Sequence, residues 1–204
     1  MDKPRIRREL VHSPAFRIAS LAVLTAVTTV FTYIVRIPVA PTRGYLNLGD
    51  VAIYFSAFTF GPVSALVSGG LGTALADIIS GYSQWAPISL FVHGLQGLVA
   101  GLIGGIVWRG TARRREPSEK DPLQKGVSRK ARGGFNVYWL VAAAAGTVVM
   151  CGGYLIAGSF MVGFGAALVE LPGNVLQNLA GVLGGIPLAM AVRRAYPPVE
   201  EMRW

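Results

Sequence analysis

Hydrophobic residues occur in six long runs along this chain of 204 residues. Most of the runs reach the ~20 residues that a helix needs to cross the hydrocarbon core of a bilayer. The second and third runs are shorter, and Gly61-Pro62 between them predicts a tight turn that joins two helices as a hairpin. The pattern predicts an all-α membrane protein with six transmembrane helices in a compact bundle. The expected helices are 15–35, 46–60, 63–79, 88–108, 137–157 and 171–192.

Composition agrees with this class, because 52% of the residues are hydrophobic and only 14% are charged. A soluble domain usually carries about a quarter charged residues. The one cysteine, Cys151, excludes an internal disulfide, and no Cys–His spacing typical of a metal site is present. The first apolar run follows basic residues, but it is long enough to span and no small-residue cleavage site follows it. We therefore interpret it as a retained helix and not as a signal peptide.

The net charge of +9 first suggests a nucleic-acid partner. However, 17 of the 19 Lys and Arg residues lie before the first expected helix or at its start, between the fourth and fifth, and after the sixth. A basic excess in loops marks the cytoplasmic side of a membrane protein. The distribution thus predicts both termini in the cytoplasm and removes the nucleic-acid interpretation. The expected segments are a basic cytoplasmic N-terminal segment (1–14), transmembrane helices 1–4 (15–108), a basic cytoplasmic loop (109–134), transmembrane helices 5–6 (135–194) and a cytoplasmic tail (195–204).

Polar residues inside the expected helices gather in the outer halves. Seven of the ten acids lie in the cytoplasmic tails and loop, and the other three lie near outer helix ends. Ionisable groups at membrane depth are costly and usually line a cavity or pathway. We therefore predict a polar pocket that opens to the outside, with Tyr45, Tyr54, Tyr82 and Trp85 available to stack on a ring. The predicted substrate-binding residues are Asp50, Asp77, His93, Gln96, Glu170, Asn174, Gln177 and Asn178.

Each of these residues also has a structural interpretation. Asp50 follows Gly49 and is suited to capping a helix, where the helix dipole favours an acid. Glu170 and Asp77 are close enough to helix ends to remain hydrated. His93 and the amide side chains of the sixth helix are equally suited to hydrogen bonds between helices. The convergence of four helices at one depth favours the pocket.

No catalytic motif is present. The chain lacks a Gly-x-Ser-x-Gly elbow, a His-Glu-x-x-His pair and a phosphate-binding P-loop. The glycines at 69, 70 and 72 lie inside an expected helix, and small residues there allow close helix packing. We expect no enzyme activity, no metal, no cofactor and no independent use of ATP.

Five motifs together resemble the substrate-binding S components of energy-coupling factor (ECF) vitamin transporters. They are YLNLGD at 45–50, FGP at 60–62, GGLGTALADIISGYSQWAP at 69–87, HGLQGLVAGLIGG at 93–105 and ELPGNVLQN at 170–178. The resemblance implies six helices with both termini inside and a vitamin site in the outer half. It also implies a membrane-embedded T component and two cytoplasmic ATPases as partners. An Ala-x-x-x-Ala surface on the first helix would meet the T component, and Ala22 and Ala26 fit it, with Ala15 and Ala19 as a second, overlapping possibility.

The predicted function is therefore capture of a water-soluble vitamin or precursor, of the riboflavin or the hydroxymethylpyrimidine/thiamine type, at the cell membrane. Outer loops that include residues 158–169 are expected to close over the ligand. Asp50, Asp77 and Glu170 are either ligand contacts or anchors for these loops. The alternatives are a membrane-embedded enzyme acting on a lipid or prenyl substrate, and an autonomous secondary transporter, although neither inverted repeats nor midplane charges are visible.

Overall fold

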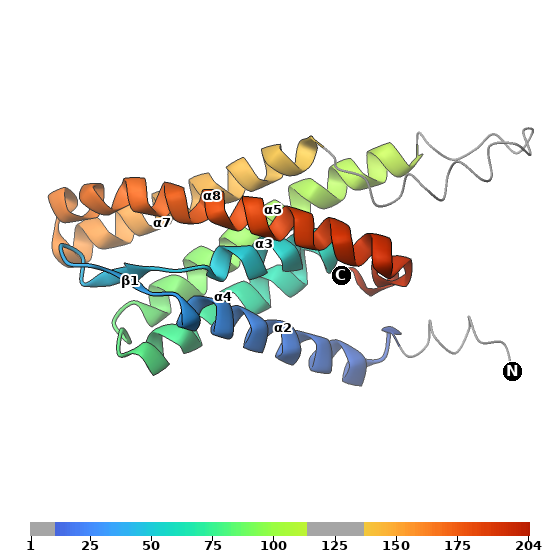
Figure 1. Cartoon of the computed structure of the whole chain (residues 1–204), viewed down its shortest axis with the longest axis horizontal. Helices are drawn as coiled ribbons and strands as arrows, with labels where there is room; N and C mark the ends of the chain where they lie inside the picture. The colour runs from blue at the N-terminus through green and yellow to red at the C-terminus, as the bar shows by residue number, and fades with distance from the viewer. Residues whose placement is uncertain (1–10, 114–136) are drawn as a thin grey trace, which may run out of the picture.

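The computed structural model describes residues 11–113 and 137–204 (Figure 1). Within these ranges the protein is helical apart from one short hairpin of strands. Five helices are long and apolar enough to cross a membrane, so the expectation of an all-helical membrane protein is confirmed at this level. The five are α2 (Pro14–Ile34), α4 (Pro62–Ser80), α5 (Ala86–Arg113), α7 (Tyr138–Val162) and α8 (Phe164–Ala195). The N-terminal residues 1–10 and most of the basic 109–134 loop lie outside the described residues.

The expected second helix, 46–60, is shorter than a membrane span. Helix α3 (Gly49–Thr59) has 11 residues, which at ~1.5 Å per residue covers about half of a bilayer core. The helix begins at Gly49 and not at residue 46, because the Asn47 side chain accepts a hydrogen bond from the Gly49 backbone N–H at 2.7 Å. An asparagine turn of this kind competes with helix formation.

An antiparallel hairpin, β1 (Ile37–Val39) and β2 (Gly44–Leu46), precedes α3. Ile37 pairs with Leu46 and Val39 pairs with Gly44. The hydrophobic pattern did not predict it, because two strands of three residues are too short to show an alternating pattern. Figure 1 shows the hairpin at one end of the bundle, beside the junctions between α4 and α5 and between α7 and α8. We call this the hairpin end; the start of α2 and the end of α8 lie at the opposite end.

Glycines with positive φ lie at three of the connections where the chain reverses direction between helices. Gly61 (φ 100°) precedes α4, and Gly81 (φ 82°) ends it in the left-handed conformation, which confirms the predicted turn before Pro62.

The expectation of an outer loop at 158–169 is wrong. Helix α7 continues to Val162 and α8 begins at Phe164, so that Gly163 (φ 92°) is the whole connection. One residue in the left-handed region is enough to reverse the chain, and Pro172 is tolerated inside α8.

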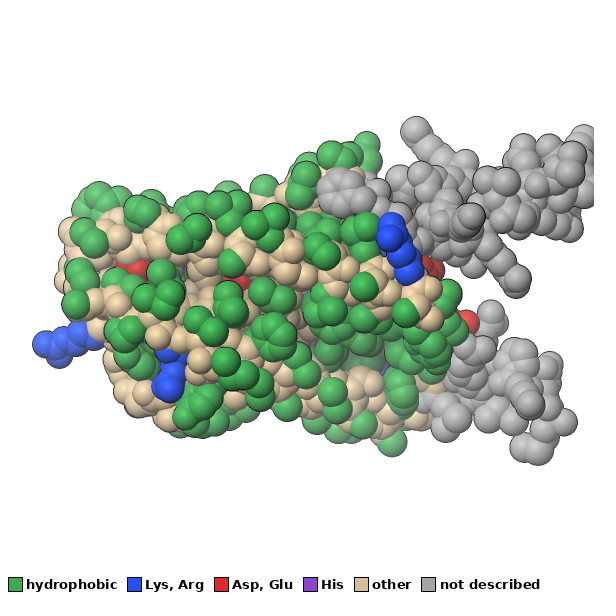
Figure 2. Space-filling model, in the orientation of Figure 1, with side chains coloured by type: hydrophobic (Ala, Val, Ile, Leu, Met, Phe, Trp, Pro, Cys, Tyr) green, Lys and Arg blue, Asp and Glu red, His purple; other side chains and the backbone are tan. Residues whose placement is uncertain are grey.

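Helices α4 and α5 approach to backbone contact through glycine. A Cβ atom at Gly97 would lie 2.7 Å from the Ala65 carbonyl oxygen, and one at Gly101 would lie 2.6 Å from Pro62 Cα. Packing of small residues replaces the hydrophobic effect as the source of helix association in lipid. Hydrophobic side chains are spread over the whole bundle surface seen in Figure 2, and few charged side chains interrupt them, as is suited to a surface that faces lipid.

Candidate functional site

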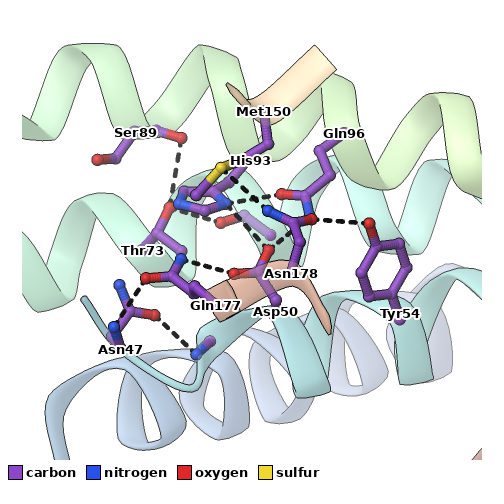
Figure 3. Close-up of polar contacts among 12 residues, drawn as sticks. Asn47, Asp50, Tyr54, Thr73, Ser89, His93, Gln96, Met150, Gln177 and Asn178 are labelled. Atoms are coloured by element: carbon purple, nitrogen blue, oxygen red, sulfur yellow. Dashed lines mark hydrogen bonds and ion pairs between the residues drawn. The ribbon is translucent and has the colours of Figure 1, made fainter. Parts of the chain in front are cut away.

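Five of the predicted polar residues meet between α3, α5 and α8, with Asp50 at the centre (Figure 3). They are Asp50, His93, Gln96, Gln177 and Asn178. Asp50 lies in the first turn of α3 and is fully buried. Its Oδ1 accepts a hydrogen bond from Gln96 Nε2, and its Oδ2 accepts one from Gln177 Nε2 at 2.6 Å. Because Leu48 occupies the cap position without a side-chain hydrogen bond, Asp50 connects helices and does not serve as the N-cap. The positive end of the α3 dipole adds a favourable interaction with the carboxylate.

Gln96 extends this network in two directions. Its Nε2 also donates to Asn178 Oδ1 at 2.9 Å, and its Oε1 accepts a hydrogen bond from His93 Nδ1 at 2.8 Å. His93 Nδ1 lies 3.7 Å from Asp50 Oδ1. Buried polar groups are expected to have partners, and in this layer they are partners of one another. We call Asp50, Gln96 and Asn178 the polar layer.

A small cavity of about 20 Å³ lies beside the polar layer. This is room for about one water molecule, whereas sites for drug-sized ligands measure roughly 300–1,000 Å³. Binding of a ligand of that size therefore requires the cavity wall to move outward. The wall is formed by Thr32, Gly44, Tyr45, Asn47, Thr73, Asp77, Trp85, Ser89, His93, Met150, Tyr154, Glu170, Asn174 and Gln177.

Two polar atoms of the wall have no hydrogen-bond partner among the described residues. Asp77 Oδ1 accepts a hydrogen bond from the Tyr45 hydroxyl at 2.7 Å, but its buried Oδ2 has none. The Tyr45 hydroxyl is the donor in this bond, because a carboxylate oxygen only accepts. Trp85 Nε1 is the second unpartnered atom. The wall thus offers a ligand one strong acceptor and one donor.

The carboxylate of Glu170 lies against the hairpin. A side chain at Gly44 would meet Glu170 Oε1 at 3.2 Å and Trp85 Nε1 at 3.7 Å. Glu170 is 8% exposed, and no Lys or Arg belongs to the wall. Two carboxylates without a basic neighbour in the wall favour a cationic ligand or one rich in hydrogen-bond donors. Asp50 and His93 are close enough to share a metal ion, but no third Asp, Glu, His or Cys joins them in the part of the chain that the structure describes.

The structure brings all eight predicted site residues to this region but in two layers. Five of them belong to the wall, whereas Asp50, Gln96 and Asn178 lie behind it in the polar layer. Which of them contact a ligand stays a prediction. The five in the wall are Asp77, His93, Glu170, Asn174 and Gln177.

Among the wall residues that sequence reasoning missed, four carry hydroxyl groups, namely Thr32, Thr73, Ser89 and Tyr154. Hydroxyl side chains are common in membrane helices because they can bond to the carbonyl of a preceding turn, as Thr32 does to Thr28. They therefore give no signal of a site. Tyr154 was detectable as an isolated tyrosine in an apolar run, and its hydroxyl lies 2.6 Å from Ser89 Oγ.

The fold defines a multi-pass membrane protein with a small polar cavity between its helices. The family model of the ECF-type riboflavin transporter, S component, matches residues 15–116, and the chain belongs to this family of transporter subunits, which are not enzymes and reside in the plasma membrane. An uncharacterized protein in the gap 3' region of Pyrococcus woesei is 31% identical over 173 residues, 85% of this chain and 99% of that protein. The thiamine precursor transporter HmpT of Lactococcus lactis subsp. cremoris (strain MG1363) is 29% identical over 179 residues, 87% of this chain and 88% of that protein.

Proposed function

We propose that this protein is the substrate-binding subunit of an ECF-type importer. It captures a water-soluble vitamin or vitamin precursor at the outer face of the membrane and delivers it together with a T component and two cytoplasmic ATPases. The observation that carries the proposal is the small polar cavity, in which a carboxylate oxygen of Asp77 and the ring N–H of Trp85 are buried and have no hydrogen-bond partner among the described residues. Unpaired buried polar atoms are costly, and a ligand that bonds to both removes the cost.

The proposed topology has six crossings, with both termini in the cytoplasm and the hairpin end outside. In this arrangement α3 and the hairpin together form the second crossing. The 17 basic residues in the three cytoplasmic segments support this orientation. Labelling of a single cysteine placed in the hairpin tests this orientation. Reagents that do not cross the membrane should reach the hairpin from outside.

The ligand that the wall favours is of the hydroxymethylpyrimidine or thiamine type. Asp77 and Glu170 suit an aminopyrimidine, which carries N–H donors beside ring nitrogens that can accept from Trp85. The relative named as a thiamine precursor transporter supports this choice. Riboflavin is the second candidate, supported by the description of the family model and by the rings of Tyr45, Trp85 and Tyr154 in the wall.

Gentle purification followed by mass spectrometry of the bound small molecule tests the function and the ligand together. We expect a pyrimidine or thiamine compound, whereas a yellow preparation would identify a flavin. Titration of the ligand-free protein with hydroxymethylpyrimidine, thiamine and riboflavin then ranks the three. Failure of all three to bind would contradict the proposal, and uptake by the isolated chain without ATP would favour the autonomous secondary transporter.

Replacement of Ala22 and Ala26 of α2 by leucine is expected to abolish ATP-dependent uptake without changing vitamin affinity. Both alanines are exposed, while Leu24 and Thr28 of the same helix are buried, so a bulky pair blocks a partner helix and leaves the cavity untouched. Uptake by cells that contain the T component and ATPases is the measurement. Ala144→Leu, at an exposed alanine of α7, is the matched control and should retain uptake. Equal uptake by the two variants would place the T component elsewhere.

A further inference from the structure

Asp50 differs from the other two acids of the site because it does not belong to the cavity wall. It is 0% exposed, and each of its oxygens accepts a hydrogen bond from the amide of a different glutamine. A carboxylate can only accept, whereas a glutamine amide has a donating end and an accepting end. Asp50 therefore requires both glutamines to turn their nitrogen atoms toward it.

The orientation of the Gln96 side-chain amide is fixed once its nitrogen faces Asp50. Its two amide protons go to Asp50 Oδ1 and Asn178 Oδ1. Asn178 Oδ1 is itself fixed as an acceptor, because the Asn178 amide nitrogen donates to the carbonyl oxygen of Asn174 at 3.1 Å. The Oε1 of Gln96 must then be the atom that meets His93 Nδ1 at 2.8 Å.

The tautomer of His93 follows. Because Gln96 Oε1 cannot donate, Nδ1 of His93 carries the proton in the neutral ring. His93 belongs to the cavity wall, and the ring nitrogen that remains for a ligand is Nε2, with its lone pair. A neutral His93 held in this way accepts a hydrogen bond from a ligand N–H or O–H group.

Gln177 carries the second branch. Its Nε2 donates to Asp50 Oδ2 at 2.6 Å, which leaves its Oε1 to accept the Asn47 backbone N–H at 2.8 Å. Asn47 in turn holds the start of α3 through the Gly49 N–H. Asp50 thereby fixes both the wall residue Gln177 and the segment that joins the hairpin to α3.

We propose that Asp50 is a positioning residue, which directs the amides of Gln96 and Gln177 and through Gln96 holds His93 in the Nδ1-protonated form that presents an acceptor to the ligand. The proposal rests on the vitamin-binding function proposed above. It adds to the acceptor on Asp77 a second acceptor at His93, so the ligand has hydrogen-bond donors at two positions.

A rescue experiment separates this role from packing, because the substitutions are nearly isosteric. Asp50→Asn places an amide nitrogen against the nitrogen of one glutamine, and we expect about tenfold weaker binding and a lower unfolding midpoint. Gln177→Glu alone places a carboxylate oxygen against the carboxylate of Asp50. We expect a similar loss of affinity and a similar fall in the unfolding midpoint. In the double variant D50N/Q177E the introduced amide donates to the introduced carboxylate, whose other oxygen still accepts from Asn47 N–H. The unfolding midpoint of the ligand-free double variant should recover to within a few degrees of wild type.

The matched control is D50N/Q96E, which carries the same charge. Its carboxylate meets the acceptor Oδ1 of Asn178, so we expect little recovery. Equal recovery by the two double variants, or wild-type behaviour of Asp50→Asn, would overturn the proposal. The unfolding midpoints are measured on the ligand-free protein, and the affinities with hydroxymethylpyrimidine, thiamine and riboflavin.

The tautomer is observed directly by NMR of nitrogen-15 histidine. The chain has two histidines, and His12→Gln leaves His93 as the source of the signal. We expect a neutral ring protonated at Nδ1; protonation at Nε2 would overturn the proposal. If the wild-type protein binds none of the three compounds, the proposed function fails, while the midpoints and the spectrum of the ligand-free protein still decide the role of Asp50.

Discussion

Asp77→Asn is expected to weaken vitamin binding about 100-fold while it stabilises the ligand-free protein. The buried Oδ2 of Asp77 has no hydrogen-bond partner among the described residues. A donor from the ligand would form a charge-assisted hydrogen bond there, which is among the stronger interactions available to a ligand. Asparagine has the same shape but no charge, so this bond is weakened or replaced by a contact between two donors.

The expected gain in stability of Asp77→Asn arises from the same unpaired oxygen. A carboxylate held away from water with one oxygen unpaired costs free energy, and the neutral amide lowers that cost because an unpaired neutral group is less costly to bury than a charge. We expect the free energy of unfolding to rise by about 1 kcal/mol. Titration calorimetry and thermal unfolding of the purified protein measure the two effects on the same samples.

Tyr45→Phe is the control for Asp77→Asn. It removes the hydroxyl that donates to Asp77 Oδ1 at 2.7 Å but leaves the carboxylate in place. Because the charge is retained, we expect a smaller loss of affinity, about tenfold, and no gain in stability. Affinity of Asp77→Asn within a few-fold of wild type would show that the ligand does not use this oxygen.

The composition of the site could be predicted because lipid leaves few alternatives for a polar side chain. Ionisable and amide groups in apolar helices turn toward the bundle interior, and those at one depth must meet. For this reason Asp50, Asp77 and His93, from three different helices, lie within one region. Sequence spacing along each helix is enough for such an inference.

The layer to which each residue belongs could not be predicted. Asp50 and Asp77 look equivalent in the sequence, since both are acids near an expected outer helix end. Their difference arises from partners on other helices: two glutamines converge on Asp50, whereas Asp77 receives one tyrosine hydroxyl from the hairpin. Contacts between residues more than 100 positions apart, as between Asp50 and Gln177, leave no pattern in a single sequence.

The connections near the hairpin end were also beyond the hydrophobic pattern. The segment 158–169 contains glycines and phenylalanines, which is typical of a loop, yet one positive φ at Gly163 lets both helices continue through it. The run 46–60 is mostly apolar in its helical part, but the Asn47 side chain accepts a hydrogen bond from Gly49 N–H, and the helix therefore begins only at Gly49. In both places a single backbone hydrogen bond or dihedral angle decided the structure.

Gly181→Ala is expected to destabilise the protein by about 2–3 kcal/mol and to disrupt the binding site. A Cβ atom at Gly181 would lie 2.4 Å from Asp50 Cβ and 3.0 Å from the Asp50 backbone carbonyl carbon. The backbone of α3 cannot yield as the tip of a flexible side chain can, so α8 and α3 must move apart. Separation of these helices stretches the hydrogen bond between Gln177 and Asp50, and we expect vitamin affinity to fall about tenfold or more.

Gly152→Ala is the matched control, since Gly152 lies inside α7 and a Cβ atom there would meet nothing within 4 Å. Alanine is favoured over glycine in a helix by about 1 kcal/mol, and this gain is common to both substitutions. The control should therefore be neutral or stabilising, with unchanged affinity, and the opposite sign at Gly181 isolates the clash with Asp50. Unfolding midpoints and ligand titrations of the two variants provide the comparison. Equal stability of the two would mean that α3 and α8 separate at little cost, and Asp50 could then not be held rigidly enough to orient two glutamines.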